Sequence, residues 1–197
     1  GSKLLGRFRN HVSQLPVTEH GDLAPETLFD ALGSDVRVVA LMHGHNELGT
    51  LSNLHELIEL TRRSAPEAHI HVDLVQTYSK LPFDFDTYDV DSIAVSGHKF
   101  HGPRGAGFLA LSNSANIGAL QEAGGQEGGL RGGTENVAGA VGLMAAAEEA
   151  RAARHEVVHA RRGGREGVGL HRVQPRRRLA RARAAEPVGR RGRRRRR

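Results

Sequence analysis

The sequence predicts an α/β protein whose mostly parallel sheet is covered by helices. Three apolar runs, at residues 36–42, 69–72 and 91–95, each end in a cluster of polar side chains. Between the first two runs lies an amphipathic segment, residues 52–63, long enough to form a crossover helix. In open α/β sheets, ligands bind beyond the carboxyl ends of the strands, so we expect the polar clusters to meet there.

The other elements follow from local patterns. Residues 25–32 favour a short helix, because Pro25 suits a first turn. The run VRVVALM at residues 36–42 is almost wholly apolar, which favours a central strand buried on both faces. Residues 107–111 favour a further strand, either at an edge or antiparallel.

Residues 134–154 predict a core helix. Thr134 is a candidate N-cap, and arginines occur late in the segment, where they favour the end of a helix. The helix would bury an apolar stripe formed by Val137, Val141, Leu143 and Met144.

The charge is unevenly distributed. Residues 151–197 hold 18 of the 28 Lys and Arg residues but only 3 of the 22 acidic residues. We therefore expect a domain over residues 1–154 and a disordered Arg-rich tail over residues 155–197. The tail could bind nucleic acid by neutralising phosphates, or it could be an accidental extension from a shifted reading frame.

Two absences limit the class of protein. The chain has no cysteine, which excludes disulfides and thiolate metal sites, and we expect an intracellular protein, cytoplasmic or mitochondrial, with no metal. It also has no apolar run of roughly 18 residues, so we expect no membrane-spanning helix.

Asp73 and Lys99 lie at the ends of two neighbouring predicted strands. Pyridoxal 5'-phosphate (PLP) needs a lysine amine for a Schiff base and an acid that keeps its ring nitrogen protonated. Both residue types at one sheet edge therefore point to PLP chemistry. Asp-x-x-Gln and Ser-Gly-His-Lys are short patterns, however, and either one alone is also found in ordinary loops.

Longer strings carry a family resemblance. HVDLVQ at residues 71–76 resembles a His-Val-Asp-x-x-Gln motif, and SGHKFHGPRGAGFL at residues 96–109 resembles a Ser-Gly-His-Lys motif followed by Gly-Pro-Lys/Arg-Gly. Over about residues 15–150 the chain resembles the class V aminotransferases of PLP fold type I, and among them the cysteine desulfurases and selenocysteine lyases. The resemblance implies a fragment of the large PLP-binding domain.

The resemblance assigns roles at the two strand ends. Lys99 would be the catalytic residue that holds PLP as a Schiff base, and Asp73 would pair with the ring nitrogen. Ser96 and His98 would bind the cofactor phosphate. The residues alone favour a different role, in which the hydroxyl and the imidazole satisfy the backbone of a tight loop.

Two amides would contact the phenolic oxygen of PLP. They are Gln76 and Asn46, the latter in a segment that resembles Asn-Asn-Glu-x-Gly. His45 replaces the first Asn of that motif, so the shape of the site beside Asn46 is not determined by the resemblance. Without the resemblance, Asn46 would be read as a turn residue.

A glycine-rich loop at residues 124–136 resembles the family's Gly-Gly-x-Gln-Glu-x-x-x-Arg-x-Gly-Thr-Glu-Asn segment. There Thr134 would reach the phosphate of a neighbouring subunit, which implies a homodimer. Gly128 stands where relatives carry Arg. On its own the loop is only a flexible segment that could bind an anion.

The implied activity is that of a PLP-dependent cysteine desulfurase in iron–sulfur cluster biogenesis. It would convert L-cysteine to alanine and pass sulfur to an acceptor protein. A selenocysteine lyase acting on L-selenocysteine, or another class V enzyme, is the alternative. Relatives carry a phosphate-binding loop, a stacking His and a cysteine nucleophile that this chain lacks. We expect a truncated enzyme with weak or no PLP binding and no turnover; the non-enzyme alternative is a basic-tailed nucleic-acid-binding or scaffold protein.

Overall fold

A computed structural model describes residues 11–85, 87–119, 121 and 124–162, the last nine of these as backbone only. The chain divides into two units, residues 1–163 and 164–197. The first contains every helix and strand described below. The second, which holds most of the predicted tail, lies outside the described residues.

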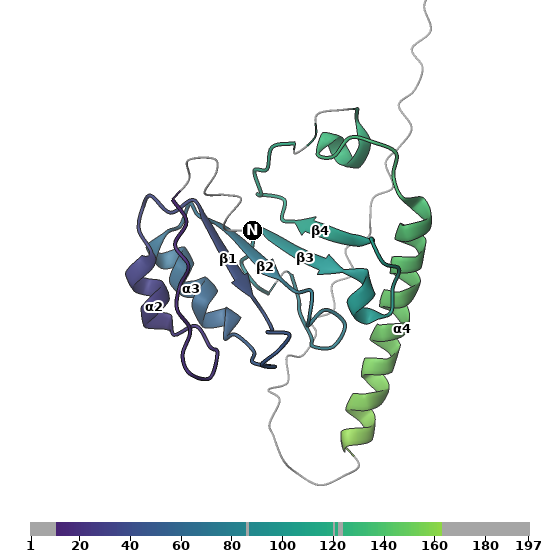
Figure 1. The fold of residues 1–197 in the computed structure, drawn as a ribbon, viewed down its shortest axis with the longest axis horizontal. Helices are drawn as coiled ribbons and strands as arrows, with labels where there is room; N and C mark the ends of the chain where they lie inside the picture. Colours follow the sequence, from purple (N-terminus) through teal and green to yellow (C-terminus); the bar gives the residue numbers. More distant parts are fainter. Residues whose placement is uncertain (1–10, 86, 120, 122–123, 163–197) are drawn as a thin grey trace, which may run out of the picture. The chain divides into compact units, whose positions relative to one another are not determined.

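A four-stranded sheet forms the centre of the first unit (Figure 1). Its spatial order follows the chain, and the first three strands are parallel while the fourth is antiparallel. The strands are β1 (Val38–Met42), β2 (His69–Asp73), β3 (Ser92–Ser96) and β4 (Gly107–Leu111). The predicted mostly parallel sheet with covering helices is confirmed.

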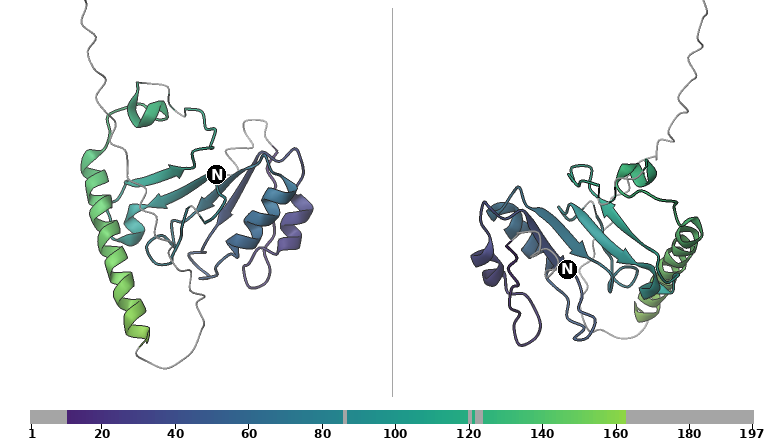
Figure 2. Two further views of the ribbon diagram at one scale, coloured as in Figure 1. Left: turned by 180° about the vertical axis from the view of Figure 1, so that it is seen from behind. Right: turned by 45° about the horizontal axis from the view of Figure 1, so that its top comes forward.

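Two helices cover one face of the sheet, α2 (Pro25–Ala31) and α3 (Leu54–Ser64). Figure 2 shows them together on the same side of β1 and β2. The core between them and the sheet contains the alternate residues of each parallel strand, because successive side chains of a strand point to opposite faces. Its fully buried members include Leu28, Leu57, Ile70, Val72 and Leu74.

The opposite face of β1 is open. Val38 is 59% exposed and Met42 is 43% exposed, while Val39 and Leu41 between them are buried. The prediction of a central strand buried on both faces was therefore wrong. Within the described residues β1 pairs only with β2 and forms an edge of the sheet, so its apolar run is half covered.

The last helix, α4 (Val137–Arg162), begins later and ends later than predicted. Its first turn is capped by Asn136, whose Oδ1 accepts a hydrogen bond from Gly139 N–H at 3.0 Å, and not by Thr134. The helix also continues past residue 154, where the predicted tail begins.

The predicted apolar stripe of α4 is mostly exposed. Val137, Val141 and Met144 are each more than half exposed. The face that packs against the core is offset from the stripe, and consists of Leu143, Ala146, Ala147 and Ala150. No helix among the described residues is long and apolar enough to cross a membrane.

Candidate active site

The carboxyl ends of β1, β2 and β3 lie at one edge of the sheet, because the three strands are parallel. Their register places Met42 beside Asp73, and Asp73 beside Ala94. Ser96 lies two residues beyond Ala94 on the same strand, so Asp73 and Ser96 point to the same face. This is the open face, opposite the one that α2 and α3 cover.

Asp73 is half-buried at the end of β2. Its Oδ1 accepts a hydrogen bond from Val75 N–H at 2.8 Å, which fixes the carboxylate at the start of the following loop. Among the contacts of the described residues, Oδ2 accepts no hydrogen bond. It is therefore available to a ligand. Gln76 is half-buried and lies on the same loop, three residues after Asp73.

Lys99 lies on the 3₁₀ turn η2 (Gly97–Phe100), which follows β3 directly. The turn is closed by two backbone hydrogen bonds of 2.9 Å, from Gly97 N–H to Ala106 O and from Gly102 N–H to Gly97 O. A Cβ at position 97 would lie 2.5 Å from Leu143 Cδ1 of α4 and 3.0 Å from Ala106 O, so a larger residue there would displace its neighbours. Lys99 is half-buried in this closed turn, whereas most lysines are solvated.

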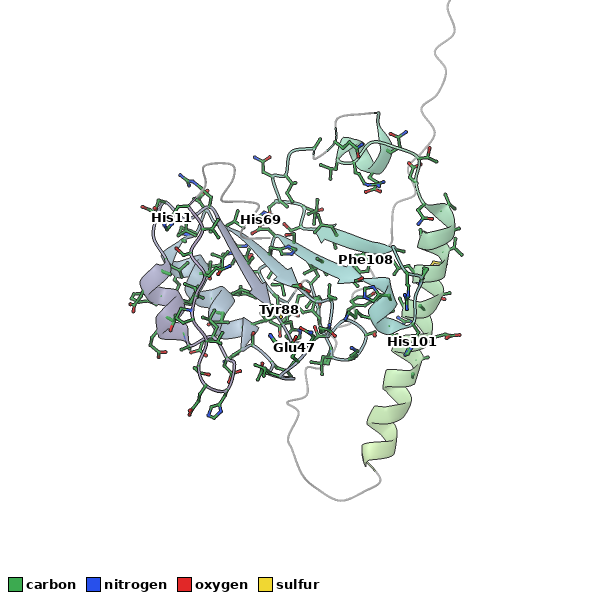
Figure 3. All side chains as sticks on the ribbon, viewed as in Figure 1. His11, Glu47, His69, Tyr88, His101 and Phe108 are labelled. Atoms are coloured by element: carbon green, nitrogen blue, oxygen red, sulfur yellow. The ribbon has the colours of Figure 1, made fainter. Side chains whose placement is uncertain are left out.

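Ser96 and His98 flank the start of the turn. Ser96 Oγ and His98 Nδ1 are hydrogen-bonded at 2.8 Å, so the hydroxyl and the imidazole form one polar unit beside Lys99. Figure 3 labels His101, which follows η2, and His69, which begins β2, at opposite ends of the strands. Ser96, His98 and Lys99 thus lie at or just after the carboxyl end of β3, and Asp73 lies at that of β2.

Asn46 lies on an exposed turn after β1. His45 shapes this turn, because its Nδ1 accepts hydrogen bonds from Glu47 N–H and Leu48 N–H, both at 3.2 Å. A side-chain acceptor that binds the backbone two and three residues ahead is the usual contribution of Asn or Asp in a turn. His45 Nδ1 thus takes the place that an Asn side-chain oxygen could take in this turn.

Thr134 is not brought to the sheet edge by any contact among the described residues. It is exposed and lies between the 3₁₀ turn η3 (Gln126–Gly129) and α4. Arg131 of the same loop is also exposed and pairs with Glu127 at 3.9 Å. An exposed Thr134 suits a contact with another molecule better than a contact within this chain.

Sequence reasoning missed a row of polar residues on the open face of the sheet. Ser92 Oγ lies 2.7 Å from His69 Nε2 and 2.8 Å from His71 Nδ1, so one hydroxyl bridges two imidazoles. Burial lowers the pKa of His71, the Asp73 carboxylate raises it, and His69 lowers it; the pKa lies below its ordinary value. Alternation along β2 could have placed His69, His71 and Asp73 on one face, but nothing local indicated Ser92.

The residues at this edge fit PLP by their chemistry. A carboxylate with a free oxygen, a half-buried amine and a hydroxyl–imidazole unit are the groups that a pyridinium nitrogen, an aldehyde and a phosphate require. Glycines at positions 97 and 102 keep the lysine turn tight. Among the described residues no group of three or more His, Cys, Asp or Glu could hold a metal ion.

Comparison with known proteins finds one matching family model and several similar proteins. The family model described as aminotransferase class-V matches residues 3–164. The chain is 37% identical over 137 residues to the cysteine desulfurase IscS of Dictyoglomus turgidum, covering 70% of this chain and 34% of that protein. It is 44% identical over 137 residues to a NifS/IcsS protein homolog of Lactobacillus delbrueckii subsp. bulgaricus, covering 69% and 35%.

A solved structure described as a NifS-like protein has a similar fold. It matches with a TM-score of 0.76 and 36% identity, over 80% of this chain and 43% of that chain. The chain therefore spans about a third of the length of the curated relatives it matches.

Proposed function

Because the chain belongs to the class V aminotransferase family, we propose that it forms part of the PLP-binding domain of a cysteine desulfurase. One observation carries the proposal: Asp73 and the turn with Lys99 follow neighbouring parallel strands at the same edge of the sheet. The names of the relatives support the choice of cysteine desulfurase within the family. PLP, when bound, supplies an electron sink that lowers the energy of negative charge developing on an amino acid substrate.

The residues at the end of β3 would hold the cofactor. Lys99 Nζ would attach it covalently, because the closed η2 turn presents the amine at a defined place. Ser96 and His98 would bind the phosphate, and their mutual hydrogen bond of 2.8 Å orients both groups.

The residues at the ends of β1 and β2 would orient the ring. Asp73 Oδ2 would accept a hydrogen bond from the protonated ring nitrogen, while Val75 N–H keeps Oδ1 in place. Gln76 and Asn46 would donate to the phenolic oxygen, with the Asn46 turn held by His45. Thr134, exposed ahead of α4, would bind the phosphate in a second copy of the chain, as part of a homodimer.

The substrate would be L-cysteine, with L-alanine as product. The C–S bond breaks, and the sulfur passes to an external thiol, which becomes a persulfide; the thiol's proton balances the hydrogen that alanine gains. None of residues 1–197 is a cysteine, so this thiol would lie outside them. Lys99 Nζ is the base on this edge of the sheet that could move the substrate proton.

Covalent trapping tests the proposal. The chain has only three lysines, Lys3, Lys80 and Lys99, so the site of reaction can be mapped without ambiguity. The full chain is mixed with PLP, reduced with borohydride, digested and analysed by mass spectrometry. Because reduction is irreversible, it accumulates even a weakly held cofactor.

We expect the pyridoxyl group mainly on Lys99, although Lys80 is exposed and Lys99 is only half-buried. The preference should decrease in Asp73→Ala, because that change removes the carboxylate that would hold the ring. Asp30→Ala, at an exposed position of α2, is a control that leaves the sheet edge unchanged. Equal labelling of the three lysines in the unchanged chain would contradict the proposal.

A further inference from the structure

The loop after β2 contacts both other strand ends of the candidate site. It begins at Asp73 and is tightly folded, since Thr77 N–H and Tyr78 N–H both donate to Leu74 O, at 3.0 and 2.8 Å. Leu74 is itself fully buried, and its N–H donates to Ala94 O of β3 at 3.0 Å. The loop is therefore anchored to the sheet immediately behind Asp73.

On the side of β1, the anchor is a hydrogen bond. Thr77 Oγ1 lies 2.9 Å from His43 Nδ1, and both residues are buried. His43 N–H also donates to Asp73 O at 3.0 Å. These contacts fix the loop relative to the end of β1, so that Tyr78 projects from a rigid base.

On the side of β3, the contact is aromatic. The ring of Tyr78 lies 5.1 Å from that of Phe100, tilted by 54°, and 5.4 Å from that of Phe108, edge-on at 80°. Phe100 is the last residue of η2, directly after Lys99, and is 2% exposed. Phe108 lies on β4, which pairs with β3 (Figure 3). Tyr78 thus joins the loop that carries Asp73 to the turn that carries Lys99.

We propose that Tyr78 is a positioning residue, whose ring sets the place of Lys99 relative to Asp73 by holding Phe100. The proposal rests on the proposed function, since it concerns the amine that would attach PLP. The turn η2 is short and is held by few backbone hydrogen bonds. The buried side chain of Phe100 therefore fixes the position of the turn. The residues that pack against Phe100 in turn fix the position of Lys99.

The matched control is the other tyrosine. The chain has two, Tyr78 and Tyr88, and both are half-buried. Tyr88 stacks on Phe83, with ring centroids 4.8 Å apart and planes within 7°, and has no aromatic contact with η2 among the described residues. Replacing either tyrosine by leucine should lower the stability of the fold. Only the replacement of Tyr78 should also displace Lys99.

The experiment measures borohydride trapping of PLP at Lys99, divided by trapping at Lys3, in four full-length chains: unchanged, Tyr78→Phe, Tyr78→Leu and Tyr88→Leu. Circular dichroism and the urea midpoint establish that each is folded. Tyr78→Phe keeps the ring and should retain the ratio. Tyr78→Leu loses two aromatic contacts and should lower the ratio about tenfold, while Tyr88→Leu should leave it within about twofold.

The outcomes separate the two proposals. If the unchanged chain shows no preference for Lys99, the proposed function fails. If the preference is present and folded Tyr78→Leu retains it, or Tyr88→Leu lowers it equally, the role of Tyr78 is refuted. If Tyr78→Leu does not fold, Phe100→Leu replaces it, because this change removes the ring contact through which Tyr78 would hold the turn. It should lower the ratio about threefold, and an unchanged ratio would refute the proposal.

Discussion

Substitution of Arg62 by alanine should destabilise the fold without affecting the candidate site. Arg62, near the end of α3, donates to Asp91 Oδ2 at 2.8 Å, to Asp89 Oδ2 at 3.0 Å and to Ala68 O at 2.8 Å. Asp91 Oδ2 also accepts from Ile70 N–H at 2.7 Å. The guanidinium thereby joins α3 to the chain at the amino ends of β2 and β3, opposite the edge with Lys99.

The magnitude follows from burial. Arg62 and Asp91 are 20% and 15% exposed, whereas Asp89 is 77% exposed. Removing one partner of a buried pair costs about 3–5 kcal/mol, and an exposed pair contributes about 0–1 kcal/mol. Because the Arg62–Asp91 pair retains some contact with solvent, we expect Arg62→Ala to lower the free energy of unfolding by about 3 kcal/mol. Asp89→Asn should lower it by less than about 1 kcal/mol.

The loss should depend on pH. Burial alone would raise the pKa of the Asp91 carboxyl, but hydrogen bonds from Arg62 and Ile70 and the charges of Arg62 and His69 lower the pKa below its ordinary value. Its stabilising contribution is therefore present above the pKa of the unfolded chain and is lost as pH falls through the folded pKa. The difference between the unchanged chain and Arg62→Ala should shrink in acid.

Urea unfolding followed by circular dichroism measures these differences. The double variant Arg62→Ala with Asp91→Asn should regain part of the stability, because no charge is left buried and unpaired. A loss below about 1 kcal/mol for Arg62→Ala, or an equal loss for Asp89→Asn, would refute the reasoning.

Three further predictions concern other contacts. Ser92→Ala should lower the free energy of unfolding by about 1–3 kcal/mol, since it leaves two half-buried imidazoles without their shared hydroxyl; an unchanged urea midpoint would contradict the bridging role. Asn136→Ala should lower the free energy of unfolding by about 1 kcal/mol and reduce the helicity of α4, whereas Thr134→Ala should change neither. Circular dichroism measures both effects. Burial lowers the pKa of His43, so the unfolded chain binds more protons and stability should fall as pH drops through about 6.5. His43→Gln should make the decrease of stability with falling pH less steep. An equally steep decrease in both chains would show that His43 does not cause it.

The sequence was informative where the signal was local. Asp73, Ser96 and Lys99 each follow an apolar run, and the parallel sheet brings the ends of those runs to one edge. The helix at Pro25 was predicted nearly to its last residue, since proline at a first turn is a local rule.

What the sequence could not supply depends on contacts between distant segments. The apolar run of β1 suits an edge strand as well as a central one, and only pairing with β2 decides between them. Thr134 and Asn136 are both good caps two residues apart, so composition could not choose between them. The contact of Tyr78 with Phe100 likewise requires the fold, because nothing near either residue indicates the other.

Titration of the pyridine nitrogen tests most directly whether PLP attached to Lys99 has its ring nitrogen against Asp73. In a chain with Lys3→Arg and Lys80→Arg, Lys99 is the remaining lysine, and PLP can be fixed to it by borohydride. The absorption of the bound pyridoxyl group as a function of pH then gives the pKa of the ring nitrogen, with and without Asp73→Asn. A carboxylate against the nitrogen should raise that pKa by about one to three units, and Asp73→Asn should remove the increase. Identical titration curves in the two chains would contradict the account.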